Sequence, residues 1–187
     1  MPKPWGDSIA THRNAVREGI KDATWSLVHE YGATGLSMSQ IADRVGVSRA
    51  TLYRYFPDVD SILVEWHTDK IHSHVAQLRQ VVADVANPVE RLEAMLECYA
   101  TIARGVPHSG ELATLFHQGA HVAQAEQQVL DLLAEVIATA AESGTVRRDV
   151  PPSDLARYCL YALAAANGSS TPESPGLVQV VLAGLRP

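Results

Sequence analysis

The sequence predicts an all-α protein of about nine helices. Prolines, which end helices or sit in their first turn, are absent from residues 5–56 and again from residues 108–150. These two stretches are rich in Ala, Leu, Glu, Gln and Arg, and their apolar residues recur every three to four positions. No segment shows the sustained alternation of apolar and polar residues that is typical of a half-buried strand.

The first predicted helix spans residues 8–31. Gly32 follows it, and a glycine in this place readily adopts the left-handed backbone conformation that ends a helix. Apolar side chains recur along the helix and predict one inward face, formed by Val16, Ile20, Ala23, Leu27 and Tyr31.

Two short helices follow the first. Ser37 opens the second helix, and Gln40 three residues later completes a capping box, in which each side chain bonds the other residue's backbone N–H. Gly46 ends this helix. Ser48 then caps a third helix, which we expect to run to residues 56–57, where a proline stops it.

The rest of the chain predicts a larger helical domain. Asp58 begins a long fourth helix, and Asn87 followed by Pro88 opens a fifth helix that ends near residue 104. After a connector at residues 105–110, the helical pattern returns in four segments: 111–118, 122–143, 154–166 and 177–185.

The charge of the chain is divided unevenly. The net charge of −6, taken for the whole chain, argues against a nucleic-acid binder, because phosphate-binding proteins usually carry a basic excess. However, residues 1–56 contain seven basic and five acidic side chains, whereas the remainder contains eight basic and sixteen acidic ones. We therefore predict a mildly basic domain over residues 1–57 and an acidic domain over residues 58–187.

Composition excludes several classes of protein. A hydrophobic content of 47% is that of a globular chain rather than a disordered one. The two cysteines, Cys98 and Cys159, are too few for a secreted disulfide framework and suggest a reducing compartment. There is no stretch like a signal peptide and no apolar run approaching the roughly 20 residues that cross a bilayer. We expect a cytoplasmic protein with no membrane partner.

Residues 37–56, SMSQIADRVGVSRATLYRYF, have the pattern of a helix-turn-helix. Ala42 is small enough for two helices to cross closely, and Gly46 accepts the positive φ of a tight turn. The apolar contacts that lock the helices together are Ile41, Val45, Val47 and Leu52. The opposite face of the third helix then carries Arg49, Ala50, Thr51, Tyr53 and Arg54. This face has no acidic group, and it suits the major groove of DNA.

The segment GLSMSQIADRVGVSRATLYRYFPDVDSIL resembles the N-terminal domain of the TetR family of transcriptional repressors. The resemblance covers residues 10–65, and GVSRATLYRYF is its most specific part. It implies a ligand-responsive repressor, not an enzyme, that binds as a homodimer to a near-palindromic double-stranded DNA operator. Two recognition helices would then occupy successive major grooves about 34–36 Å apart.

The same resemblance implies roles for individual residues. Ser37 would cap the second helix and touch a phosphate, and Ser39 would lie near the groove edge. Arg49 would donate two hydrogen bonds to guanine O6 and N7. The implied DNA-binding set comprises Ser37, Ser39, Ser48, Arg49, Ala50, Thr51, Tyr53, Arg54 and Tyr55.

The start of the fourth helix departs from the family pattern. The family commonly has a phosphate-contacting lysine there, where this chain has Val59 between two aspartates. Backbone amides at the helix N-terminus can hold a phosphate instead. Lys3 and Arg13, from the N-terminal arm, are further candidates for phosphate contact.

No motif after Asp58 names a ligand, and we expect an unidentified, largely apolar small-molecule effector. Large or polar-tipped residues on apolar helix faces either line its pocket or pack the core. They are Trp66, Met95, Tyr99, Phe116, His117, Tyr158 and Tyr161. The last two helices carry more apolar surface than one core needs, which predicts a four-helix dimer interface, with burial inside the monomer as the alternative. This interface would contain Leu160, Leu163, Val178, Val181, Leu182 and Leu185.

Two other functions remain open at this point. A helical small-molecule-binding protein or a metal-dependent enzyme would draw on the histidines of the acidic domain, such as His117 and His121, which lie four residues apart. The sequence shows no HExxH pattern and no convergent acid–base group, so we predict no metal site and no cofactor. The third possibility is a protein-interaction bundle with a relic DNA domain.

Overall fold

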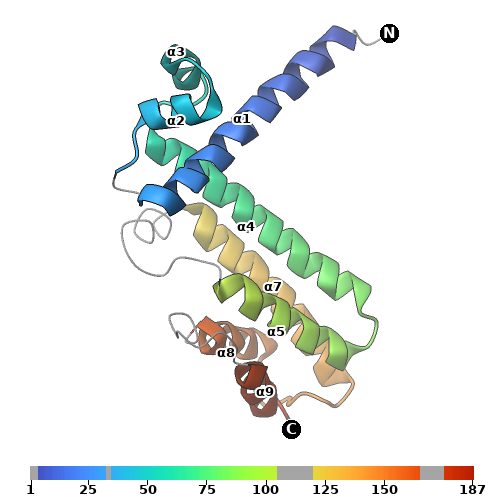
Figure 1. Ribbon diagram of the computed structural model, residues 1–187. Coiled ribbons are helices and arrows are strands. Elements are labelled where there is room, and N and C mark those ends of the chain that lie inside the picture. Colours follow the sequence, from blue (N-terminus) through green and yellow to red (C-terminus); the bar gives the residue numbers. More distant parts are fainter. Residues whose placement is uncertain (1–3, 33–34, 105–119, 165–174) are drawn as a thin grey trace. The chain divides into compact units, whose positions relative to one another are not determined.

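The computed structural model describes residues 4–32, 35–104, 120–164 and 175–187 (Figure 1). These residues form eight helices and no strand, which confirms the all-α prediction. The helices are α1 (Pro4–Tyr31), α2 (Met38–Val45), α3 (Arg49–Tyr53), α4 (Val59–Asp84), α5 (Pro88–Arg104), α7 (Ala120–Glu142), α8 (Pro152–Ala164) and α9 (Pro175–Gly184). The helix predicted at 111–118 lies outside the described residues. None of the eight helices is long and apolar enough to cross a membrane.

Helix ends differ from the prediction mainly at prolines. Helices α1, α8 and α9 each begin at a proline, two to four residues before the predicted start, because proline suits the first helical turn. Helix α3 ends at Tyr53, three residues early. There the backbone N–H of Arg54 bonds Thr51 O (3.1 Å) and that of Tyr55 bonds Leu52 O (2.9 Å), so the chain tightens into a turn. Phe56 precedes a proline, which disfavours helical backbone at that residue.

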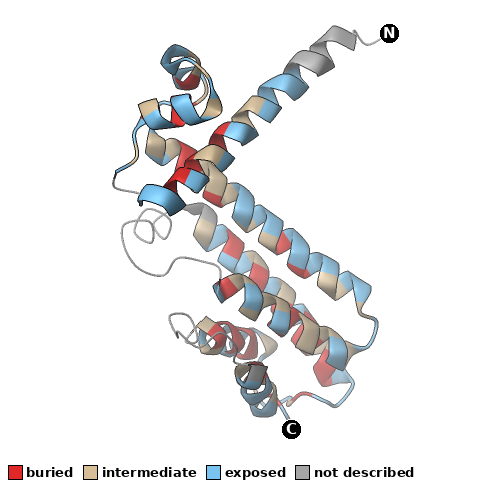
Figure 2. Cartoon of the chain, in the orientation of Figure 1, coloured by how far each residue is buried: buried red, intermediate tan, exposed pale blue. Residues whose placement is uncertain are grey.

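The chain divides into two compact units, and the division falls inside α4, after Lys70. The core of the N-terminal unit contains the predicted contacts Ile41, Ala42 and Leu52, all at most 1% exposed, with Val45 and Val47 packed against it. These contacts confirm the predicted packing of the helix-turn-helix. Buried residues of this unit appear on α1, α2, α3 and the start of α4 in Figure 2.

Helix α1 shows two differences from its predicted inward face. Ile20 and Leu27 are buried as expected, but Tyr31 is 60% exposed, so its inward placement was wrong. Packing ends with Val28, and Tyr31 lies beside a shallow groove with Gln40 and Arg44 of α2. Thr24 is fully buried, and its hydroxyl donates to Ile20 O at 2.7 Å, which satisfies the polar group inside the core.

The C-terminal unit has its own core, built from α4 after Lys70 and from α5, α7, α8 and α9. Five of the six residues predicted for the dimer interface belong to this core, at 0–4% exposure: Leu160, Leu163, Val178, Val181 and Leu185. A second copy cannot bury them further. The interface prediction is therefore corrected for these five, because the helices of the unit itself cover their apolar stripe.

The three caps predicted at Ser37, Gly46 and Ser48 are all present. Ser37 and Gln40 make a capping box, with Ser37 N donating to Gln40 Oε1 at 2.9 Å and Gln40 N to Ser37 Oγ at 3.4 Å. Gly46 ends α2 with φ +74°, and Ser48 Oγ accepts the N–H of Thr51 at 3.1 Å. These local bonds fix the turn between α2 and α3.

We predict that Gly46→Ala lowers the free energy of unfolding by about 1–2 kcal/mol, since an alanine must adopt the left-handed conformation there. A Cβ at Gly46 meets no atom within 4 Å, so the cost comes from the backbone alone. Urea unfolding followed by tryptophan fluorescence reports on this region, because all three tryptophans precede Lys70.

Gly19→Ala is the matched control. Gly19 lies inside α1 with open space around it, so alanine should stabilise the protein by about 0.5–1 kcal/mol. Equal effects of the two substitutions would contradict the assigned role of Gly46.

Candidate nucleic-acid interface

Helix α3 is oriented by its buried side. Leu52 is fully buried and Phe56 is 1% exposed, so this side of the segment faces the core of the N-terminal unit. The opposite side therefore faces solvent. Arg49, Ala50 and Arg54 are exposed on it, and Tyr53 is 55% exposed. The structure thus brings the basic and hydroxyl-bearing residues of α3 together on one face.

The remaining predicted DNA-binding residues are partly engaged within the protein. The hydroxyl of Ser37 donates to Gln40 Oε1 at 2.6 Å, so Ser37 would give up this bond to donate to a phosphate. The hydroxyl of Thr51 lies 2.9 Å from that of Ser48. Ser39 is half-buried, and Tyr55 is half-buried against the core.

Three basic side chains of the N-terminal unit outside α3 are engaged in ion pairs. Arg17 and Lys21 bind carboxylates of α4, and Arg44 binds Glu30 through two hydrogen bonds of 2.7 and 2.8 Å. Within the described part of the chain, Arg49 and Arg54 form no ion pair with an acidic side chain. Their charges remain available to a phosphate or a base edge.

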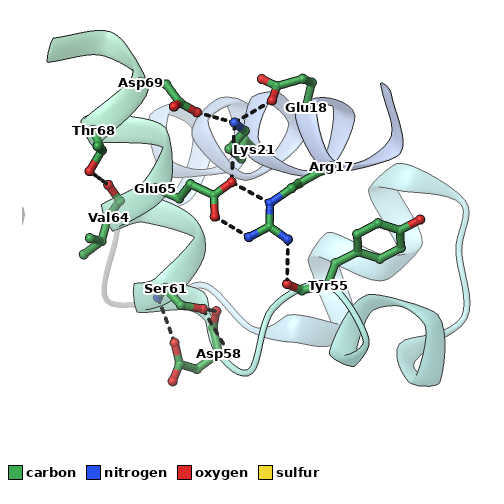
Figure 3. A network of polar contacts seen from close by, with 10 residues as sticks. All are labelled: Arg17, Glu18, Lys21, Tyr55, Asp58, Ser61, Val64, Glu65, Thr68 and Asp69. Atoms are coloured by element: carbon green, nitrogen blue, oxygen red, sulfur yellow. Dashed lines mark hydrogen bonds and ion pairs between the residues drawn. The ribbon is translucent and has the colours of Figure 1, made fainter. Parts of the chain in front are cut away.

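Arg17 and Lys21 lie at the centre of a network that joins α1 to α4 (Figure 3). The guanidinium of Arg17 binds Glu65 through two hydrogen bonds, one of them from Nε to Oε1 at 2.6 Å. Lys21 is 3% exposed and binds Asp69 and Glu18, the latter at 2.7 Å. Arg17 and Lys21 lie four positions apart on α1, as do Glu65 and Asp69 on α4, so each pair shares a helix face.

This network shifts the pKa values of its members. The hydrogen bond from Arg17 lowers the pKa of Glu65 below its usual range. Burial acts to lower the pKa of Lys21, but Asp69 and Glu18 outweigh it and leave that pKa raised. Both groups are thus held in their charged forms at neutral pH.

The N-terminus of α4 is already occupied by a carboxylate. Asp58 Oδ1 accepts the backbone N–H of Ser61 at 2.7 Å, and the Ser61 hydroxyl donates to Asp58 O at 2.8 Å. A phosphate at this helix end would compete with a fixed anion. Of the alternatives considered for phosphate contact, Arg13 lies in an exposed stretch of α1, and Lys3 lies outside the described residues.

The residues predicted for the effector pocket are dispersed. Trp66 belongs to the N-terminal unit, where its ring stacks on Trp25 with 3.8 Å between ring centroids. In the C-terminal unit, Met95 is buried in the core and Tyr99 is half-buried. The two other tyrosines there are exposed, Tyr158 by 45% and Tyr161 by 60%. The remaining two predicted residues, Phe116 and His117, lie outside the described residues.

Glu126 acts on two of these candidates, Tyr161 and Tyr99. Tyr161 Oη donates to Glu126 Oε1 at 3.4 Å, and the pKa of Tyr99 is raised by burial and then by the charges of Glu126 and Tyr161. A separate cavity of about 120 Å³ lies between α5, α7 and α9 and includes Leu182 in its lining. It is smaller than the roughly 300–1,000 Å³ of typical ligand pockets.

Cysteines and metal ligands show no cluster in the described parts of the chain. Cys98 is half-buried and Cys159 is buried, and burial raises the pKa of the Cys159 thiol to about 12. Among the described residues, no group of three or more His, Cys, Asp or Glu side chains is placed to hold a metal ion. Because its pKa is raised, the thiol of Cys159 is protonated at neutral pH and packs as a small apolar group.

A short helix that packs by one side on the core of a helix-turn-helix and exposes a basic face on the other is typical of helix-turn-helix DNA-binding proteins. Residues 20–65 match the sequence profile of the bacterial regulatory proteins of the tetR family. Residues 88–187 match that of the C-terminal domain of SbtR-like transcriptional regulators. The chain is also 33% identical to an uncharacterized HTH-type transcriptional regulator of Mycobacterium tuberculosis (strain H37Rv), over 94% of this chain and 89% of that protein. The chain belongs to the TetR family and is a transcriptional regulator, as the sequence predicted.

Solved structures share the fold. A TetR/AcrR-family regulator from Thermobifida fusca superposes with a TM-score of 0.76 at 21% identity, covering 91% of this chain and 98% of that one. AibR, solved in complex with isovaleryl coenzyme A and operator DNA, superposes with a TM-score of 0.63 at 21% identity, covering 92% and 98%. At these identities the likeness concerns the fold.

Proposed function

We propose that this regulator is a homodimeric repressor. Residues 1–57 bind a near-palindromic double-stranded operator through α3, and residues 58–187 bind a largely apolar small molecule that releases the protein from DNA. Two copies of α3 occupy successive major grooves about 34–36 Å apart. The effector changes operator affinity only as far as it binds the two states of the protein unequally.

The exposed face of α3 carries this proposal. Leu52 and Phe56 anchor the segment, while Arg49 and Arg54 point away from the core without an acidic partner in the described chain. A planar guanidinium recognises guanine O6 and N7 with two parallel hydrogen bonds. We assign this contact to Arg49, at the start of α3, and backbone contacts to Tyr53 and Arg54.

Few phosphate contacts are available to this domain. Val59 replaces the lysine expected at the start of α4, and Asp58 occupies the backbone N–H of Ser61. Arg17 and Arg44 are engaged by carboxylates. Because non-specific affinity for DNA comes from neutralised phosphates, this protein should bind random DNA weakly and depend on base contacts for its operator affinity.

The effector is assigned to the C-terminal unit. AibR, which shares this fold, was solved in complex with isovaleryl coenzyme A and operator DNA, so the fold can accommodate both a small molecule and DNA. Our candidates for polar contacts that orient a mainly apolar ligand are Tyr161, which bonds Glu126, and Tyr99, whose pKa the charge of Glu126 raises.

The homodimer is assigned to the exposed face of α8 and α9. A Cβ at Gly184 would lie 3.0 Å from Tyr158 Oη, so Tyr158 of α8 lies across α9 at this glycine. Val180 is four residues before Gly184, on the same side of α9, and is 63% exposed. Tyr158 and Val180 therefore form an apolar surface that a second copy can cover.

We predict that Arg49→Ala weakens operator binding by about 1–3 kcal/mol and relaxes specificity at one base pair of each half-site. Fluorescence anisotropy with DNA from upstream of the protein's own gene, and with single-base variants of it, measures both effects.

Arg79→Ala is the charge-matched control for this prediction. Arg79 is an exposed arginine of the C-terminal unit that bonds Gln128, so its removal should leave operator affinity unchanged. Unaltered affinity and base preference in the Arg49→Ala protein would exclude Arg49 as the base-reading residue.

We predict that Val180→Asp raises the dimer dissociation constant roughly tenfold or more, because each copy would bury an unpaired carboxylate in the interface. Sedimentation equilibrium at several protein concentrations measures this constant. Val89→Asp, at a valine of α5 that is 42% exposed, is the control and should leave it unchanged. A Val180→Asp protein that dimerises like the parent would place the interface elsewhere.

A further inference from the structure

The two ends of the α3 segment are held in different ways. Its first turn is held locally, by the Ser48 cap. Its final turn is held from a distant part of the chain, because Arg17 Nη1 of α1 donates to Tyr55 O at 3.1 Å (Figure 3). This carbonyl comes directly after Tyr53 and Arg54, the two residues to which we assign backbone contacts.

Arg17 is itself fixed in orientation. Two hydrogen bonds to the carboxylate of Glu65 align its guanidinium plane. The guanidinium carbon also lies 4.2 Å from the centroid of the Phe56 ring, which is at the end of the same turn. With Glu65 on one edge and Phe56 against its face, the guanidinium plane is fixed, and Nη1 is directed at the carbonyl of Tyr55. A flexible ammonium would have no such plane.

The neighbouring pair serves as an internal comparison. Lys21 joins α1 to α4 through Asp69 and lies 3.7 Å from Glu65, and it also pairs with Glu18 of its own helix. Its ammonium has no contact with α3 among the described interactions. Both cations therefore join α1 to α4, but only Arg17 extends this connection to the recognition segment.

We propose that Arg17 is a positioning residue for operator recognition, setting the last turn of α3 and thereby the placement of Tyr53 and Arg54 on DNA. This proposal rests on the operator binding by α3 proposed above. Arg17 touches neither base nor phosphate in this role. It acts through the carbonyl of Tyr55, and its effect is confined to contacts made by the end of α3, whereas Arg49 at the start of α3 is unaffected.

The test compares Arg17→Lys with Lys21→Met. Arg17→Lys keeps the charge but loses the planar fork, and operator binding by the folded protein should weaken roughly tenfold, as expected for one lost charge-assisted hydrogen bond. Lys21→Met should lower the urea midpoint of unfolding and leave operator affinity unchanged. Amide hydrogen exchange at Tyr55 and Phe56, relative to α4, should accelerate only in the Arg17→Lys protein.

A double-mutant cycle separates positioning from general stability. In the Arg17→Lys background, Tyr53→Phe should cost less operator affinity than in the parent, because the hydroxyl is already misplaced. Arg49→Ala should cost the same in both backgrounds. A purely stabilising role for Arg17 would leave both costs unchanged.

The proposal is overturned if Arg17→Lys binds operator as the parent does, or loses no more affinity than Lys21→Met. It is also overturned if both second substitutions are additive with Arg17→Lys. Failure of the parent protein to bind any operator would instead overturn the proposed function, so the two failures are distinguishable.

Discussion

The burial of Leu52 and Phe56 is the interaction on which the DNA-reading surface depends. Helix α3 has five residues, far below the ~12–15 at which an isolated helix becomes even marginally stable in water. Its conformation must therefore come from tertiary contacts. Leu52 and Phe56 supply them from the core, Ser48 caps one end, and Arg17 holds the other. The same contacts leave the polar side of α3 exposed.

Internal pairing of charges explains how an acidic protein can regulate transcription. The net charge of −6 describes the whole chain, but the local supply of free positive charge matters at a DNA surface. Ion pairs with α4 and α1 engage Arg17, Lys21 and Arg44, and these pairs build the support of the helix-turn-helix. Among the described residues, Arg49, Arg54 and the exposed Arg13 form no ion pair and remain available to DNA. The charged side chains that stabilise the helix-turn-helix and those that face DNA are thus different residues at different positions.

Features that depend on residues close together in the sequence could be predicted from it, whereas features set by residues far apart in the chain could not. The capping box at Ser37, the left-handed Gly46 and the buried Leu52 all follow from local patterns. The burial of Lys21 was not foreseen, because it depends on Asp69 and Glu65 of α4, which are distant in the sequence. The signal in the sequence was the four-residue spacing that Arg17 and Lys21 share with Glu65 and Asp69. An apolar residue such as Val181 can be covered either by its own unit or by a second copy of the protein. Only the structure could show that Val181 is buried within its own unit.

Methylation interference on the operator can establish whether α3 reads bases in the major groove. Methylation of guanine N7 blocks the acceptor to which Arg49 is assigned, and this atom lies in the major groove. If α3 reads this groove, methylation should abolish binding at two clusters of guanines, centred about 10 base pairs apart. Interference confined to minor-groove positions, or the absence of any guanine at which methylation matters, would contradict major-groove reading by α3.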